Sequence, residues 1–215
     1  MMQLLICGID EAGRGPLAGP VAAAAVILPA YGEHKFLNDS KKMSAAQREH
    51  ARSLICSGAL AWGIGWATHT EIDTINILQA SLLAMKRAFE QMCKSEALKK
   101  NLWVNEGQRF KIEVIVDGLY IPDLGAFTPA PAGDRIQWSD TACRALVKAD
   151  AQIPEVMAAS ILAKTARDSY MDKMAVQYPQ YGYDRHKGYP TKAHREAIIK
   201  YGPSPIQRRS FSVKP

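Results

Sequence analysis

The sequence predicts a three-layer α/β domain followed by a basic helical extension. Apolar runs typical of buried strands alternate with amphipathic helical patterns, as expected for helices packed on both faces of a sheet. The chain has 215 residues, of which 47% are hydrophobic and 22% charged. This length and composition fit a globular protein with a large core and argue against disorder. We expect a main domain over residues 1–177 and an extension over 178–215 packed on it.

Strands and helices are expected in alternation along most of the chain. The strands are predicted at residues 4–9, 21–28, 59–66, 110–116 and 142–148. The helices are predicted at residues 44–56, 70–92, 154–176 and 191–201. Residues 94–108 are expected to form a polar connection, and residues 121–134, rich in Pro, Gly and Ala, a loop.

Local signals predict where the helices begin. Ser44 with Gln47, and Thr70 with Asp73, are taken as helix-capping pairs. Pro154 suits the first position of a helix. In the second helix, apolar residues that recur at helical spacing are expected in the core: Ile72, Ile75, Leu78, Leu82 and Met85.

Several protein classes are disfavoured by composition. No apolar run approaches the length of a membrane span, and the N-terminus lacks the basic segment of a signal peptide. The four cysteines have no metal-type spacing, so free thiols in a reducing compartment are expected: Cys7, Cys56, Cys93 and Cys143. We therefore expect a cytoplasmic protein without membrane contact.

The positive charge is concentrated in the last quarter of the chain. Residues 164–215 carry eleven Lys or Arg and four Asp or Glu, whereas the rest of the chain carries 16 basic and 17 acidic residues. A basic segment of this kind suits a polyanionic partner, and a solubilising surface is the alternative. Tyrosines between the basic residues favour nucleic acid, because bases stack on aromatic rings: Tyr178, Tyr181, Tyr183 and Tyr189.

Three predicted strands end in an acid: Asp10, Asp117 and Asp150. Sites in open α/β sheets form at the carboxyl ends of strands, so these carboxylates are expected to converge. Converging acids repel one another unless divalent cations neutralise them, and oxygen ligands suit Mg²⁺ or Mn²⁺. Two such ions would activate water and stabilise the leaving oxygen of a phosphodiester. Glu11 reaches the same site only if the strand ends or bends there, and an ordinary solvated turn is the alternative for both Asp10 and Glu11.

Two basic features accompany the acids. Gly13 and Gly15 flank Arg14, so the backbone can approach a ligand closely while the guanidinium meets a phosphate. Ser160, Lys164 and Arg167 share one face of the predicted helix after Asp150. This polar stripe is either an ordinary solvated face or a ridge that contacts phosphates.

Ordered motifs carry a family resemblance. They begin with Gly8-Ile9-Asp10-Glu11-Ala12-Gly13-Arg14-Gly15 and continue with Leu37-Asn38-Asp39-Ser40-Lys41-Lys42, Val116-Asp117-Gly118 and Lys148-Ala149-Asp150. They end with Ala158-Ala159-Ser160-Ile161-Leu162-Ala163-Lys164, His186-Lys187-Gly188-Tyr189-Pro190-Thr191 and Gly202-Pro203-Ser204-Pro205. In this order, over residues 8–211, the motifs resemble those of ribonuclease HII, the type 2 ribonuclease H family.

The resemblance implies a ribonuclease H-like fold, with a mixed β-sheet flanked by helices and a C-terminal helical extension. It implies hydrolysis of RNA in RNA–DNA hybrids and cleavage 5′ to single ribonucleotides in duplex DNA, leaving 3′-hydroxyl and 5′-phosphate ends. The family's metal-binding acids correspond to Asp10, Glu11, Asp117 and Asp150. The other expected nucleic-acid contacts are Gly13, Arg14, Gly15, Lys41, Ser160, Lys164, Arg167, Lys187 and Tyr189, with Tyr189 stacking at the RNA–DNA junction.

Alternatives follow from the same residues. Gln207 stands where the family pattern leads us to expect histidine. The start of the chain disfavours a type 3 enzyme, and residues 213–215 do not resemble a sliding-clamp peptide. A monomer is expected. The competing hypotheses are a non-catalytic binder of RNA–DNA hybrids and a type 3-like enzyme that needs runs of ribonucleotides.

Overall fold

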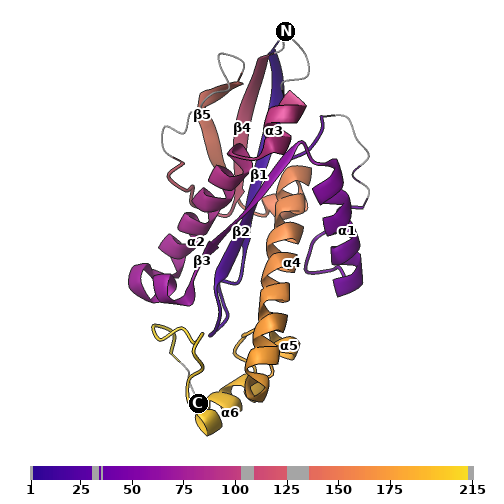
Figure 1. Ribbon diagram of the computed structural model, residues 1–215. Helices are drawn as coiled ribbons and strands as arrows, with labels where there is room; N and C mark the ends of the chain where they lie inside the picture. Colours follow the sequence, from indigo (N-terminus) through magenta and orange to yellow (C-terminus); the bar gives the residue numbers. More distant parts are fainter. Residues whose placement is uncertain (1, 31–33, 35, 103–108, 125–135, 213–215) are drawn as a thin grey trace.

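A mixed sheet lies at the centre of the computed structural model, which describes residues 2–30, 34, 36–102, 109–124 and 136–212 (Figure 1). Within these residues the strand order is β3-β2-β1-β4-β5. β1 pairs antiparallel with β2 and parallel with β4; β2–β3 is antiparallel and β4–β5 parallel. The strands are β1 (Met2–Ala12), β2 (Val21–Ile27), β3 (Ala61–Ala67), β4 (Arg109–Asp117) and β5 (Ile136–Leu146).

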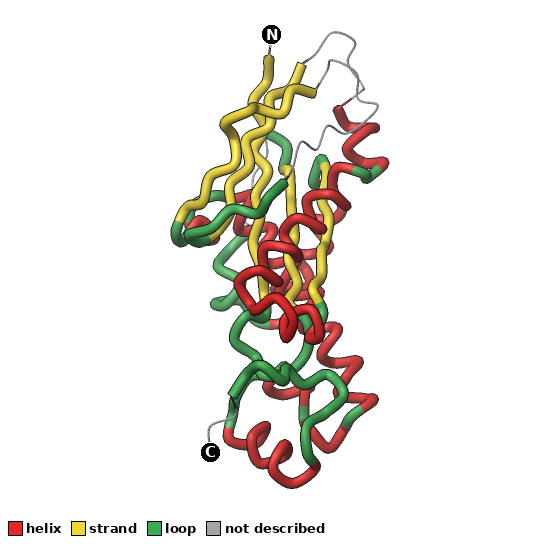
Figure 2. Tube along the Cα trace, turned by 90° about the vertical axis from the view of Figure 1, so that its left-hand side faces the viewer, coloured by secondary structure: helices red, strands yellow, loops and turns green. Residues whose placement is uncertain are grey.

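Helices cover both faces of the sheet, which confirms the predicted three-layer architecture (Figures 1 and 2). α2 (His69–Cys93) packs on one face, and α1 (Ala45–Gly58) and α4 (Pro154–Gln177) lie on the other. The interior strand β2 shows why two cores form: Ala23 and Ala25 face the α2 core, whereas Ala24 and Val26 face the α1/α4 core. Alternating side chains of a fully buried strand are therefore apolar on both sides.

The chain after α4 forms a helical extension at the end of the molecule where β1 ends (Figures 1 and 2). Its elements are η3 (Pro179–Tyr181), α5 (Tyr183–His186) and α6 (Lys192–Tyr201). The extension holds the 13–20 loop, which joins β1 to β2: Leu17 N–H donates to the Gly188 carbonyl, and Arg208 N–H donates to the Leu17 carbonyl. Among the described helices, none combines the length and apolarity needed to cross a membrane.

The start of α2 differs from the prediction. The N-cap is Thr68, which forms a capping box with Glu71, in place of Thr70 with Asp73. Asp73 instead accepts hydrogen bonds from the backbone N–H groups of Arg209 and Ser210, so it fixes the C-terminal segment. The sequence contains the pattern of this capping box, Thr68 followed three residues later by Glu71, in which each side chain accepts from the other residue's backbone N–H.

A kink changes which residues of α2 reach the core. Asn76 has φ 67°, and its side-chain oxygen accepts from the N–H groups of Leu78 and Gln79, as at the start of a new helix. The break shifts the helical phase, and Ile77 takes the core position expected for Leu78. The other four predicted residues of this face, Ile72, Ile75, Leu82 and Met85, do pack in or against the core.

Two further segments need correction or lie outside the described residues. The predicted polar connection contains a short helix, α3 (Glu96–Leu102), because Leu98 is buried against the α2 core. The last strand begins at Ile136, earlier than expected, since parallel pairing with β4 extends it. Most of the predicted 121–134 loop and the 213–215 terminus lie outside the described residues. The four cysteines are free, as predicted.

Candidate active site

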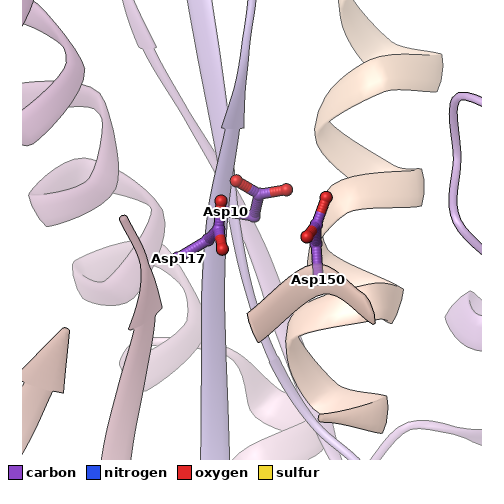
Figure 3. Close-up of side chains that lie close together, drawn as sticks. All are labelled: Asp10, Asp117 and Asp150. Carbon is purple, nitrogen blue, oxygen red and sulfur yellow. The ribbon is translucent and has the colours of Figure 1, made fainter. Parts of the chain in front are cut away.

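The three predicted strand-end acids converge in the structure (Figure 3). Parallel pairing of β1 with β4 sets Ile9 opposite Val116, so Asp10 and Asp117 follow at neighbouring carboxyl ends. Asp150 lies in η2 (Ala149–Ala151), the single turn between β5 and α4. Each of the three acids offers an oxygen within 4.8 Å of those of the other two.

Close packing of α4 on β1 completes the site. A Cβ at Gly8 would lie 2.2 Å from the backbone of Glu155 and Val156, so only glycine admits the helix start at this distance. Gly8 and Asp10 share one strand face because side chains alternate. The same face meets Ser160 of α4, whose hydroxyl lies 3.0 Å from that of Ser40 and acts to lower the pKa of Asp10.

The electrostatics of the acids fit a divalent cation. Burial, followed by the charge of Glu11, raises the pKa of Asp10 well above its usual value. Burial and the charge of Asp150 raise the pKa of Asp117. The compensating cation seen within the described residues is Lys41, whose Nζ lies 3.2 Å from an Asp150 oxygen. An oxygen-only ligand set with unneutralised charge suits Mg²⁺ or Mn²⁺ and disfavours zinc.

Glu11 lies beside this cluster but outside the group of three. We expected Glu11 to share the site only if the strand ends or bends at this point. The strand does not end at Asp10, because Glu11 still pairs with Ala23. Both acids nevertheless line one cavity. One Glu11 oxygen accepts from Arg14 at 3.3 Å, whereas Oε2 is buried and has no hydrogen-bond partner among the described residues. A buried carboxylate oxygen without a donor is a fitting ligand for a cation.

The cavity lined by Asp10, Glu11 and Asp117 is also lined by the glycine-rich loop, whereas Asp150 is not among its lining residues. Its volume is about 580 Å³. Gly13 has φ +100°, and a Cβ there would lie 2.0 Å from Arg167 Nε, so both conformation and space require glycine. The cavity is lined by acids, loop residues and polar side chains: Asp10, Glu11, Ala12, Gly13, Arg14, Gly15, Ser40, Lys41, Arg48, Asp117, Ser160, Lys164, Arg167 and Tyr189.

The predicted polar stripe on α4 divides into different roles. Lys164 lines the cavity, and its Nζ pairs with Asp168 at 2.8 Å. Arg167 is 1% exposed, and its guanidinium donates to the carbonyls of Pro20, Ala18 and Lys187. Arg167 still lines the cavity, so a phosphate contact through it stays a prediction, although carbonyls of the 13–20 loop and of Lys187 already engage its guanidinium.

The remaining predicted contacts lie at the cavity or near it. Tyr189 is 41% exposed, and its ring lies beside Gly15, 3.5 Å from where a Cβ would stand. Lys41 reaches the acids from the loop before α1. Lys187 is not among the residues that line the cavity; its ammonium pairs with Asp172 and also donates to the Asp184 carbonyl.

Sequence reasoning did not single out two arginines. Arg48 of α1 lines the cavity and donates to the Ser40 and Met43 carbonyls and, at 3.5 Å, to Asp168. Arg208 is 0% exposed and bonds the glycine-rich loop. The sequence signal for Arg48 is weak, because one arginine in a first helical turn is common. No local signal marks Arg208, because its neighbours Gln207, Arg209 and Ser210 are polar as well.

Solved structures with the same architecture define the class of protein. The ribonuclease H2 from Pyrococcus horikoshii OT3 matches with a TM-score of 0.63 and 26% identity, over 97% of this chain and 94% of that chain. Bst-RNase HIII in complex with Mn²⁺ matches with a TM-score of 0.66 and 17% identity, over 98% of this chain and 68% of that chain. With the acidic cluster, this fold defines a metal-dependent nuclease of the ribonuclease H class.

Sequence comparison makes the assignment more specific. The family model described as Ribonuclease HII matches residues 7–214. A ribonuclease HII of Treponema denticola is 50% identical over 211 residues, which cover 98% of this chain and 99% of the relative. A ribonuclease HII of Dechloromonas aromatica is 47% identical, over 96% and 90% of the two chains. The chain belongs to the ribonuclease HII family, metal-dependent endoribonucleases that act on RNA–DNA hybrids.

Proposed function

We propose that the enzyme, besides hydrolysing RNA in hybrids, cleaves on the 5′ side of a single ribonucleotide embedded in duplex DNA. One observation carries this proposal: the Gly13-Arg14-Gly15 loop lines the same cavity as Asp10, Glu11 and Asp117. A glycine backbone can approach a ribose closely enough to probe its 2′-hydroxyl, the group that distinguishes RNA from DNA. Recognition through the sugar and phosphate accepts any base, as removal of misplaced ribonucleotides from DNA requires.

The metal ligands that we propose are Asp10, Asp117 and Asp150, with Glu11 through its unpartnered oxygen. Two bound Mg²⁺ or Mn²⁺ ions supply an activated water and charge stabilisation of the leaving oxygen. The Mn²⁺ in Bst-RNase HIII, which has the same fold, supports this type of ion. Hydrolysis breaks the bond between phosphorus and the 3′ oxygen, so the products carry 3′-hydroxyl and 5′-phosphate ends.

The chain's own side chains are proposed to position the duplex. Arg14, with a side chain 48% exposed, and Lys41, at 76%, are free enough to meet phosphates at the cavity mouth. Lys164 and Lys187 add positive charge, and Ser160 lines the cavity beside Asp10. Tyr189 offers an exposed ring beside Gly15 on which the junction can stack without regard to base identity.

The test uses three end-labelled duplexes: all DNA, DNA with one ribonucleotide, and an RNA–DNA hybrid. We expect Mg²⁺- or Mn²⁺-dependent cleavage of the last two, at the 5′ side of the ribonucleotide in the second, and none in EDTA. Phosphatase treatment of the products identifies the 5′-phosphate. Asp10→Asn is expected to abolish cleavage, and Glu49→Gln, an exposed acid paired with Arg52 on α1, serves as the matched control.

The alternatives give different results in the same assay. Cleavage of the hybrid without cleavage at the single ribonucleotide indicates a type 3-like enzyme. Tight binding of the hybrid without cleavage in either metal indicates a non-catalytic binder. Both results contradict the proposal.

A further inference from the structure

Arg208 of the C-terminal extension is bonded to the inner side of the glycine-rich loop. Its guanidinium donates to the carbonyl oxygens of Gly13 at 2.6 Å, Arg14 at 2.9 Å, Gly19 at 2.9 Å and Pro20 at 3.2 Å. The side chain is fully buried, with an exposed fraction of 0%. It therefore holds the 13–20 loop at both of its ends.

These bonds determine which way the loop's N–H groups point. In a planar trans peptide, the carbonyl of one residue and the N–H of the next point in opposite directions. Because Arg208 draws the Gly13 and Arg14 carbonyls inward, the N–H groups of Arg14 and Gly15 must point away from it. Among the described residues neither N–H group donates a hydrogen bond within the protein. Two adjacent donors are thus left for a ligand in the cavity that Arg14 and Gly15 line.

Arg167 provides an internal comparison. It is also buried and also bonds carbonyls of the loop, but those of Ala18 and Pro20, together with that of Lys187. None of its described bonds reaches the carbonyls of Gly13 or Arg14. Both arginines therefore bond the loop and Arg167 also packs against Gly13, but of the two it is Arg208 that bonds the Gly13 and Arg14 carbonyls.

The charge of Arg208 strengthens this arrangement. Burial, followed by the neighbouring charge of Arg167, lowers the pKa of Arg208 to about 9, so it stays protonated at neutral pH. Its hydrogen bonds polarise the two peptide groups in a medium of low dielectric constant, which makes their N–H groups stronger donors. A neutral or shorter side chain at this position loses both the orientation and the polarisation.

We propose that Arg208 is a positioning residue, which sets the Gly13-Arg14-Gly15 backbone in the orientation that contacts the ribonucleotide. The proposal rests on the proposed function, because it assigns that loop to ribose and phosphate recognition. It attributes substrate discrimination to a residue that never touches the substrate and lies nearly 200 positions away in the chain.

The experiment compares Arg208→Lys with two matched variants. Arg209→Lys makes the same change at the neighbouring exposed arginine, and Arg167→Lys removes buried bonds to the carbonyls of Ala18, Pro20 and Lys187 while Arg208 keeps its bonds to those of Gly13 and Arg14. For each protein we would measure kcat and KM on the single-ribonucleotide duplex and on the hybrid. Hydrogen–deuterium exchange of segment 10–20 and the melting temperature would be measured alongside. Assays are run well below every melting midpoint.

For Arg208→Lys we expect faster exchange of segment 10–20 and a fall in kcat/KM on the single ribonucleotide of about tenfold to 100-fold, as misplacement of a binding group produces. The fall on the hybrid should be smaller, because many registers are available there. Arg167→Lys should lower kcat/KM on both substrates in proportion, and Arg209→Lys should lower kcat/KM on neither. Parallel losses in Arg208→Lys and Arg167→Lys, or faster exchange without a change in discrimination, would overturn the proposal.

Two further arms keep the test decisive. If Arg208→Lys does not fold, Arg208→Gln, which keeps two N–H donors, replaces it and is judged by the same criteria. If the wild-type protein cleaves the hybrid but not the single ribonucleotide, the proposed function has failed, and Arg208 is judged on the hybrid alone. A loss of kcat/KM there beyond that of Arg167→Lys, with faster exchange of segment 10–20, supports the positioning role, and an equal loss rejects it.

Discussion

Gln207 pairs with Ala18 in an isolated antiparallel bridge, and this contact joins the C-terminal extension to the loop beside the active site. The Gln207 side chain is 5% exposed, and within the described residues neither its amide nitrogen nor its amide oxygen has a partner. This is also the position at which the family resemblance leads us to expect histidine. The backbone therefore forms the bridge, whereas burial of the unpaired side-chain amide costs stability.

Replacing this amide by an apolar group of similar size should stabilise the protein. We expect Gln207→Met to raise the free energy of unfolding by about 1–2 kcal/mol, because it removes the desolvation penalty of unpaired polar atoms. Urea denaturation measures the change, and Gln180→Met, at an exposed position, is the control. No gain over the control would show that the amide is satisfied by water.

Loss of the Tyr189 ring should lower the cleavage rate at single ribonucleotides more than the cleavage rate of long hybrids. Tyr189→Phe keeps the ring beside Gly15 and should retain most activity, whereas Tyr189→Ala should lose about 1–3 kcal/mol of productive interaction, the range of one stacking contact. Cleavage rates on both substrates, with a melting curve, test this. An equal loss on both substrates that follows a fall in melting temperature would assign the ring to packing alone.

The acids were predictable from the sequence, whereas the roles of Arg48 and Arg208 were not. Asp10 and Asp117 follow apolar strands directly, so a local pattern places them at one sheet edge. The spacing of Ser160, Lys164 and Arg167 correctly predicts one helix, but spacing does not reveal that Arg167 is buried against carbonyls of the 13–20 loop and of Lys187. Arg208 finds its acceptors nearly 200 residues away, and no local pattern reports such a contact.

Some differences in the fold come from competing local signals. Thr68 and Glu71 form the box at the start of α2, and Thr70 stood close enough to be mistaken for the cap. Asn76 then interrupts the helix because its side chain caps the next turn. The first part of β5, residues 136–141, depends on pairing with β4. The pattern of its own residues does not predict a strand there.

Binding to nucleic acid should weaken steeply with salt, since basic residues release counterions from phosphates. In the inactive Asp10→Asn background, Lys41→Met should reduce the slope of log K against log salt by about one. Lys111→Met, at an exposed position towards the far end of β4 from Asp117, should leave the slope unchanged. Filter binding of the hybrid in EDTA measures both salt slopes. An unchanged slope in Lys41→Met would show that Lys41 does not contact phosphate.

Without divalent ions, the acidic cluster should make stability depend on pH. The pKa of Asp10 is raised in the folded protein, so the folded state keeps a proton that the unfolded chain has released. Stability attributable to Asp10 is therefore lost as the pH rises from about 4, the unfolded value. In EDTA, the gain in unfolding free energy from Asp10→Asn should grow between pH 4 and neutrality. A gain that does not vary with pH would contradict the assigned direction.

The central claim is that the Asp10, Asp117 and Asp150 cluster supports catalysis by holding divalent cations. The most direct measurement is the cleavage rate of an RNA–DNA hybrid as a function of Mg²⁺ concentration for wild type, Asp117→Asn and the control Glu49→Gln. We predict that wild type and Glu49→Gln saturate at similar rates. Asp117→Asn, still folded, should remain at least about 100-fold slower at any Mg²⁺ concentration. A near-wild-type rate for Asp117→Asn in saturating Mg²⁺ would contradict the metal site.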